Sequence, residues 1–231
     1  MLNAAAKIDQ PSLSHNLLGQ RLGRKGRGTR GRILAATAQL LAEPSDAPIS
    51  LSAVAREASL GMTTLYLYFS DLTELLLAAL EPIMASAEGS YIAHLRARWP
   101  DRDLGAHSVE FVQEYHAFWK RHTRILHLRN SLADANDARM RMNRIQMSQP
   151  LIQLLVSQMD DDPATHRSPS SYMATVLLTG IERIVTVATD AFFSKMPIED
   201  RDVHVGNLLI AEARLLELAV RDRRAAASRA R

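Results

Sequence analysis

Three hydroxyl-bearing side chains, Thr63, Thr64 and Tyr66, lie close together near the end of the segment SLSAVAREASLGMTTLYLYF, residues 50–69. A threonine hydroxyl can bond a base edge or a phosphate in the major groove of DNA, and a methionine such as Met62 can contact a thymine methyl group. These short side chains are suited to reading duplex DNA. That chemistry requires a rigid element that holds them against the groove.

The spacing of the apolar residues predicts such an element. Behind Ser50, a favourable N-cap, apolar side chains repeat at three and four residues and line one helix face: Leu51, Val54, Ala55 and Ala58. After a turn at residues 59–61, Leu65 and Phe69 lie four apart and should fill the same core. Two short helices joined by a tight turn form a helix-turn-helix, whose second helix enters the major groove.

The same region resembles the N-terminal domain of TetR-type repressors. The resemblance covers about residues 29–80 and is carried by Thr29-Arg30, the helix at 33–41, Val54-Ala55, and Thr64-Leu65-Tyr66 followed by Tyr68-Phe69. In that family the last motif belongs to the recognition helix. The resemblance implies that Thr64 and Tyr66 contact phosphates and that Phe69 packs in the core.

Three residues depart from the family pattern. Ser59 stands where glycine usually accepts a left-handed turn conformation, which costs another residue roughly 1 kcal/mol. Leu72 stands where a phosphate-binding lysine is common, and Ser52 stands where many members carry arginine. The last two departures remove positive charge from the expected DNA-binding face.

A basic segment upstream offers a replacement for that charge. Residues 1–32 carry seven basic side chains and one acid, a net charge of +6, whereas the whole chain carries +3. Glycines at 23, 26, 28 and 31 predict a flexible arm over residues 1–28 that contacts phosphates. Whether the arm also reads bases in a minor groove, or is a solvated tail that adds nonspecific affinity, stays open. The expected DNA-contacting residues are Arg24, Lys25, Arg27, Thr29, Arg30, Ser50, Ser52, Met62, Thr63, Thr64 and Tyr66.

Composition excludes several classes of protein. A chain of 231 residues with 47% hydrophobic content predicts two domains, residues 29–80 and residues 81–231, after the arm. The absence of cysteine excludes disulfides and thiolate metal sites. Because no apolar run approaches roughly 18 residues and no hydrophobic signal core is present, we expect a cytoplasmic protein that does not contact membranes.

Beyond residue 70 the apolar pattern is helical, which predicts an all-α fold with a larger C-terminal domain. Asp71 is a favourable N-cap for a helix that links the two domains. Further helices are expected at about residues 84–98, 104–132, 134–159, 170–195 and 200–226. Pro150 should kink or restart the third of these, with Ser148 available as a cap.

The last two helices carry broad apolar stripes that one chain would scarcely cover. The resemblance implies that this pair packs against its copy in a four-helix homodimer interface, with Gly180 and Ala188 permitting close approach; ordinary core within one chain is the alternative. The expected interface residues are Val176, Gly180, Ile184, Val187, Leu208, Leu215 and Leu216. Such a dimer would present two recognition helices about 34 Å apart, to an inverted-repeat operator.

Aromatic residues concentrate on the expected helix at 104–132. Together with methionines they suit an adaptable apolar ligand pocket, although the same spacing also fits simple core. The pocket candidates are Phe111, Tyr115, Phe118, Trp119, Met140, Met147, Tyr172 and Met173. The candidate polar anchors are Glu114, His116, Asn143 and Glu182.

Catalysis is not expected. His116, His122 and His127 are spaced six and five apart, unlike the i,i+4 pair of a zinc-binding helix. Glu110 and Glu114 share a face, but no nucleophile, phosphate loop or metal motif accompanies them. We therefore expect no metal and no cofactor. The expected function is that of a homodimeric transcriptional repressor released from its operator by a small hydrophobic effector; the alternative is an architectural DNA-binding protein without an effector.

Overall fold

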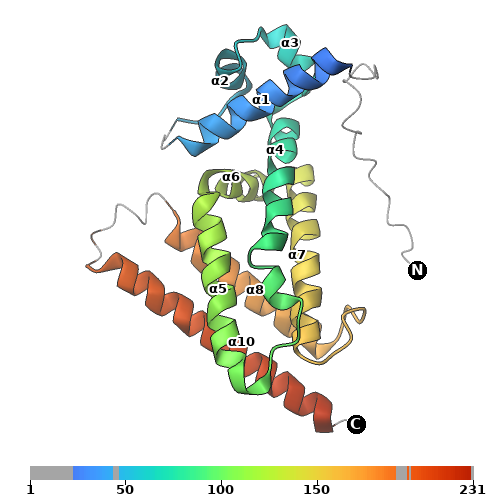
Figure 1. The fold of residues 1–231 in the computed structure, drawn as a ribbon, viewed down its shortest axis with the longest axis vertical. Coiled ribbons are helices and arrows are strands. Elements are labelled where there is room, and N and C mark those ends of the chain that lie inside the picture. Colours follow the sequence, from blue (N-terminus) through green and yellow to red (C-terminus); the bar gives the residue numbers. More distant parts are fainter. Residues whose placement is uncertain (1–22, 44–46, 191–196, 198, 230–231) are drawn as a thin grey trace. The chain divides into compact units, whose positions relative to one another are not determined.

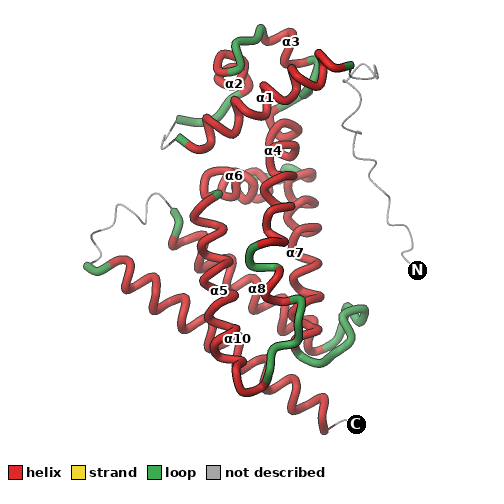
Figure 2. The backbone as a smooth tube through the Cα atoms, in the orientation of Figure 1, coloured by secondary structure: helices red, strands yellow, loops and turns green. Residues whose placement is uncertain are grey.

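The computed structural model of the chain describes residues 23–43, 47–190, 197 and 199–229. These residues form helices joined by turns and loops, with no strand among them (Figure 2). The all-α prediction is therefore confirmed. The chain divides into two compact units, Met1–Leu80 and Glu81–Arg231.

The first unit contains α1 (Arg24–Ala42), α2 (Leu51–Glu57), α3 (Met62–Tyr66) and the first part of α4 (Leu72–Ser86) (Figure 1). Helix α2 packs against both α1 and α3. The core of this unit is formed by buried apolar side chains from all four helices and the α3–α4 turn: Ile33, Val54, Leu65, Phe69, Leu75 and Leu76. The predicted core positions of Leu65 and Phe69 are thus confirmed.

Local side-chain bonds start two of these helices at the predicted residues. The Ser50 hydroxyl accepts a hydrogen bond from the Ala53 backbone N–H at 3.2 Å, which caps α2. The Asp71 carboxylate accepts one from the Glu74 N–H at 2.9 Å at the start of α4. Both predicted N-caps are confirmed.

The turn between α2 and α3 has the left-handed residue that the sequence predicted. Ser59 has a φ of 53°. The Leu60 N–H donates to the Ala55 carbonyl at 2.8 Å, so the turn satisfies a carbonyl that the helix end would otherwise leave unpaired. A serine therefore occupies a conformation that favours glycine.

Helix α1 begins earlier than the sequence predicted. Arg24 to Gly28 are helical, although four nearby glycines indicated a flexible arm up to residue 28. The Arg27 N–H donates to the Gly23 carbonyl at 3.0 Å, and arginine and lysine offset part of the low helix propensity of glycine. The remainder of the predicted arm, residues 1–22, lies outside the described residues.

In its described residues, the second unit contains the end of α4, three short 3₁₀ turns and five helices. The turns are Ala87–Gly89, Ala93–Leu95 and Asp101–Asp103. The helices are α5 (Leu104–Arg121), α6 (Thr123–Asp134), α7 (Ala138–Gln158), α8 (Pro169–Ala188) and α10 (Arg201–Arg229). Helix α10 packs against α5 and α8, and α7 packs against α6 and α8 (Figure 1).

Two of the predicted helices were wrong, and of the two outcomes predicted at Pro150, a kink or a restart, the restart does not occur. The helix expected at 84–98 is replaced by the end of α4 and two 3₁₀ turns. The helix expected at 104–132 breaks at His122, which has φ −118° and ψ 25° and separates α5 from α6. Helix α7 continues through Pro150 without restarting, and the Ser148 hydroxyl donates to the Ile145 carbonyl at 2.9 Å instead of capping a new helix.

A buried polar network ties the C-terminal helix to the loop before α5. The Arg224 guanidinium donates to the carbonyls of Gln158, at 2.7 Å, and of Trp99, at 2.9 Å, and also bonds Asp101. The Gln158 side chain accepts from the Trp99 N–H at 3.0 Å and donates to the Leu95 carbonyl at 3.0 Å. The loop therefore has its polar backbone groups satisfied by α7 and α10.

Helix α8 is more apolar than predicted from the sequence. This 20-residue helix contains an 18-residue window with a mean hydropathy of 1.2, and is long and apolar enough to cross a membrane by length and composition alone. The prediction that no such run exists was wrong on this measure. A core helix passes the same test, and α8 packs against α5, α7 and α10 with Ala174, Leu178 and Ile181 buried.

Candidate functional site

Helices α2 and α3 carry five of the eleven residues expected to contact DNA. Tyr66 is 50% exposed, and Thr63 and Ser52 are exposed as well, while Met62 and Thr64 are half-buried. Leu65, between Thr64 and Tyr66, is fully buried. Helix α3 is thus anchored by Leu65 and presents hydroxyl groups on its other side.

Two of the predicted contact residues use their hydroxyls within their own helices. The Ser50 hydroxyl caps α2 and also lies 3.0 Å from the Ser52 hydroxyl. The Thr29 hydroxyl donates to the Lys25 carbonyl at 3.2 Å. Ser50 therefore shapes the site by fixing the start of α2.

The basic residues of α1 fall into two groups. Arg24, Lys25 and Arg27 are exposed in the first turn of the helix, a position that the helix dipole makes unfavourable for cations. The Arg30 guanidinium instead lies over the Phe69 ring, 5.2 Å from its centroid. Arg30 thus packs against the residue that anchors the end of the helix-turn-helix.

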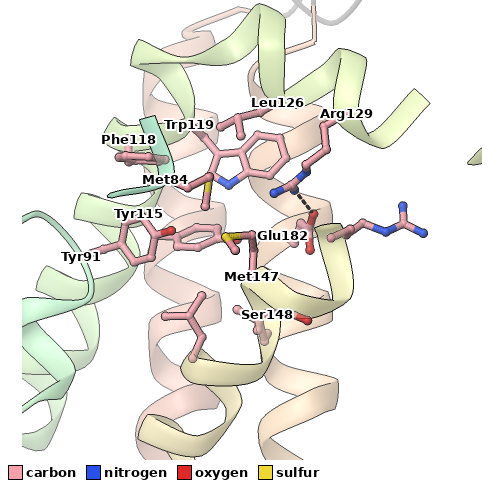
Figure 3. A pocket seen from close by; sticks show the side chains of 13 residues that line it. Met84, Tyr91, Tyr115, Phe118, Trp119, Leu126, Arg129, Met147, Ser148 and Glu182 are labelled. Atoms are coloured by element: carbon pink, nitrogen blue, oxygen red, sulfur yellow. Dashed lines mark hydrogen bonds and ion pairs between the residues drawn. The ribbon is translucent and has the colours of Figure 1, made fainter. Parts of the chain in front are cut away.

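A pocket lies in the second unit (Figure 3), with a cavity volume of about 20 Å³, or about 350 Å³ when the space open to solvent is counted. Its aromatic wall comes from Tyr91, Tyr115, Phe118 and Trp119. Its aliphatic and methionine wall comes from Met84, Leu126, Met147, Leu151 and Leu178. Its polar groups are Arg129, Arg144, Ser148 and Glu182. An apolar pocket with a few polar groups is the usual form of a small-molecule site.

The pocket includes some of the predicted residues and omits others. Tyr115, Phe118, Trp119 and Met147 line it, as does the predicted polar anchor Glu182. The other four candidates do not line it: Phe111, Met140, Tyr172 and Met173.

Packing explains the four omissions. Phe111 and Met140 are fully buried, and the Phe111 ring packs between Tyr91 and Trp99, with centroids 6.4 and 6.3 Å away. Tyr172 is exposed on α8 and Met173 is half-buried there. Helical spacing predicts which face of α5, α7 and α8 is apolar. It does not predict which residues of that face border the pocket.

The polar end of the pocket contains an ion pair. Nη2 of Arg129 donates to Oε1 of Glu182 at 3.0 Å (Figure 3), and Nε donates to the Asn130 side-chain oxygen at 3.1 Å. The Arg129 side chain is only 5% exposed, and its guanidinium lies 5.6 Å from the centroid of the Trp119 ring. Sequence reasoning missed Arg129, although its position three residues after Leu126 and four before Ala133 places it on the apolar face of α6.

Burial keeps the other titratable groups near the pocket neutral. It raises the pKa of the Tyr91 and Tyr115 phenols far above their ordinary value, so both remain protonated. It also lowers the pKa of His127, whose ring packs edge-on against Trp119 and lies 3.0 Å from the Thr189 hydroxyl. The charged groups that line the pocket are therefore Arg129, Arg144 and Glu182.

The residues expected at a dimer interface differ in how much surface they present. Val176 on α8 and Leu215 on α10 are 68% and 55% exposed, and Ile184, Val187 and Leu208 are half-buried. Leu216 is fully buried within the second unit and presents no surface to a partner, so its assignment to the interface was wrong.

Gly180 also has a role within the chain. A Cβ atom at this position would lie 2.8 Å from Oε1 of Glu212, so the glycine makes room for the α10 carboxylate. Gly180 was expected to allow two copies of the chain to pack closely. It instead allows α8 and α10 of one chain to pack closely.

No protein-family model matches the chain, and no curated protein sequence does. Among solved structures, it resembles the crystal structure of a candidate transcriptional regulator, SCO7518, from Streptomyces coelicolor A3(2). The TM-score is 0.56 at 22% sequence identity, and the match covers 81% of this chain and 97% of that one. The two proteins share a fold over most of both chains.

Proposed function

We propose that this protein is a TetR-type, sequence-specific DNA-binding regulator that acts in the cytoplasm as a homodimeric repressor. The observation that carries the proposal is the pair α2 and α3, joined by a left-handed turn, with Leu65 buried and Thr63 and Tyr66 exposed. The similarity in fold to a candidate transcriptional regulator supports it.

In this proposal α3 enters the major groove. Thr63 and Met62 read base edges, and Tyr66 and Thr64 bond phosphates that position the helix. The exposed Arg24, Lys25 and Arg27 at the start of α1 supply phosphate contacts. A cationic first turn is unfavourable for an isolated helix, and bound phosphate would remove that penalty.

The apolar surface of the second unit supports the proposed dimer. Side chains of α8 and α10 that are large, hydrophobic and exposed include Tyr172, Val176, Val203, Ile210, Leu215 and Leu218. Burying them against a second copy would form a four-helix interface and present two α3 helices to an inverted repeat.

The pocket is proposed to hold a small hydrophobic effector. Met84 lines the pocket and belongs to α4, a continuous helix that begins at Leu72 in the first unit. A ligand that binds more tightly to one position of α4 would shift the population of DNA-binding states, and repression would end when that shift separates the two α3 helices.

Three single variants test the placement of α3. Tyr66→Phe should weaken binding to all duplexes, because it removes one phosphate bond, by up to about 1.5 kcal/mol. Thr63→Ala and Met62→Ala should change the preferred bases. Selection of duplexes from a random library gives the preference, and fluorescence anisotropy gives the affinity.

Tyr68→Phe is the matched control, because it removes the same hydroxyl from a half-buried tyrosine two residues away. If all three variants bind the wild-type operator with unchanged affinity and preference, the placement of α3 in the groove is wrong. If binding depends on α3 but no small molecule changes it, the architectural alternative gains support.

A further inference from the structure

The charges that line the pocket are all paired. The buried Arg129 is bonded to Glu182, and Arg144 is bonded at 2.9 Å to Asp134, whose side chain is 70% exposed. Burial keeps Tyr91 and Tyr115 protonated and neutral. The pocket is therefore electroneutral when it is empty. A ligand with a net charge would place an uncompensated charge in a largely apolar site, which is unfavourable.

The Arg129–Glu182 pair keeps unused hydrogen-bonding capacity. Nε and Nη2 of Arg129 donate to Asn130 and Glu182, and Oε1 of Glu182 accepts from both Arg129 and Asn130. Among the described residues, no acceptor bonds Nη1 of Arg129 and no donor bonds Oε2 of Glu182. The pair thus offers a donor and an acceptor on two bonded side chains that both line the pocket, and a carboxylate placed at Nη1 would also approach the negative charge of Glu182.

The surroundings of the pair favour a flat ring. The Trp119 ring lies under the Arg129 guanidinium (Figure 3). Tyr91 lies edge-on to Tyr115 and Phe118, with centroid distances of 4.7 and 5.1 Å. Aromatic side chains in offset and edge-on arrangements pack well against another aromatic ring.

We propose that the pocket selects neutral, planar aromatic compounds that carry an adjacent hydrogen-bond acceptor and donor, such as a primary carboxamide or a lactam. The carbonyl accepts from Arg129 and the N–H donates to Glu182, while the ring lies against the aromatic wall. This inference rests on the effector-binding role proposed above and names the chemical class of that effector.

Direct binding measurements with four naphthalene compounds test the class. The compounds are 2-naphthamide, 2-naphthoate, 2-naphthylmethylammonium and 2-methylnaphthalene, which share the ring and differ in charge and hydrogen-bonding groups. Calorimetric titration of the full chain at neutral pH should give the tightest binding for the amide, by about tenfold over each charged compound. Equal or tighter binding of the carboxylate or the ammonium compound overturns the proposal, as does equal binding of 2-methylnaphthalene.

The variant Glu182→Gln makes the test sharper. It keeps the shape of the side chain and leaves Arg129 without a counter-charge, so the preference should reverse in favour of 2-naphthoate. If Glu182 only supported the fold, its substitution would weaken the binding of all four compounds together. Glu88→Gln is the matched control, because Glu88 also bonds an arginine, Arg96 at 2.7 Å, but does not line the pocket. The control should keep the wild-type order, and an unreversed order in Glu182→Gln contradicts the proposal.

Operator titrations with the same compounds separate this inference from the function on which it rests. Preferential binding of the amide without any change in operator affinity upholds the ligand class and removes the effector role. Release of the operator by these compounds in an order unrelated to their charge upholds the effector role and overturns the ligand class.

Discussion

At the scale of single residues, Ser59 stores strain in the turn that sets the angle between α2 and α3. Its φ of 53° lies in the region that favours glycine. Ser59→Gly should raise the free energy of unfolding by up to about 1 kcal/mol, because the relief of strain exceeds the entropy that glycine loses on folding. Urea denaturation followed by circular dichroism measures the change.

Gly61→Ala is the control for that substitution. Gly61 has a φ of −72°, which any residue adopts, and a Cβ atom there meets no neighbour within 4 Å. Alanine at this position should not destabilise the protein. If the free energy of unfolding of Ser59→Gly is equal to or below that of the wild type, the turn carries no strain.

Single residues with local roles could be predicted from the sequence. Ser50 and Asp71 cap helices through backbone groups three residues away, and Leu65 and Phe69 face one core because they lie one turn apart. The pairing of Arg129 could not be found in this way. Its partner Glu182 lies 53 positions further along the chain, so the ion pair depends on how α6 and α8 come together.

At the scale of elements, the packing of α10 places two glutamates in opposite electrostatic environments. Burial beside α8 raises the pKa of Glu212 above its ordinary value, with no compensating partner among the described residues. Hydrogen bonds from Arg214 and Arg221 lower the pKa of Glu217. A raised carboxyl pKa makes the folded state less stable as the pH rises through it, and a lowered pKa makes the folded state less stable as the pH falls.

Two matched variants test these opposite effects. Glu212→Gln should raise the free energy of unfolding at pH 7, and the gain should disappear well below the ordinary carboxyl pKa of 4.5, where the wild-type side chain is protonated in both states. Glu217→Gln should lower the free energy of unfolding at pH 7, and that loss should also shrink in acid. Denaturation across this pH range measures the free energy of unfolding of both variants. If both variants are more stable than the wild type at pH 7, or both less stable, the assigned environments are wrong.

The elements themselves were only partly predictable. Apolar spacing identified the helical segments, but it joined α5 to α6 because no glycine or proline marks the break at His122. It also extended a helix over 84–98, where the loop is instead held by Arg224 and Gln158. Contacts between residues far apart in the sequence decide such boundaries, and the local pattern does not contain them.

At the scale of the whole molecule, the proposed repressor is a dimer formed by α8 and α10. Leu215→Glu should yield a monomer, because it places a charge at the centre of the proposed apolar interface. Ile145→Glu is the matched control, because it adds the same charge at a similarly exposed position on α7. Size-exclusion chromatography with light scattering gives the mass, and a Leu215→Glu protein that remains dimeric would exclude Leu215 from the interface.

The proposed function depends above all on the binding of a specific DNA sequence by α2 and α3. Its most direct test is a titration of the purified wild-type protein against DNA from its own upstream region, at two salt concentrations and with excess nonspecific duplex present. We expect saturable binding to an inverted repeat that survives the competitor and weakens as salt increases. Binding that the competitor abolishes, or no binding at either salt concentration, would contradict it.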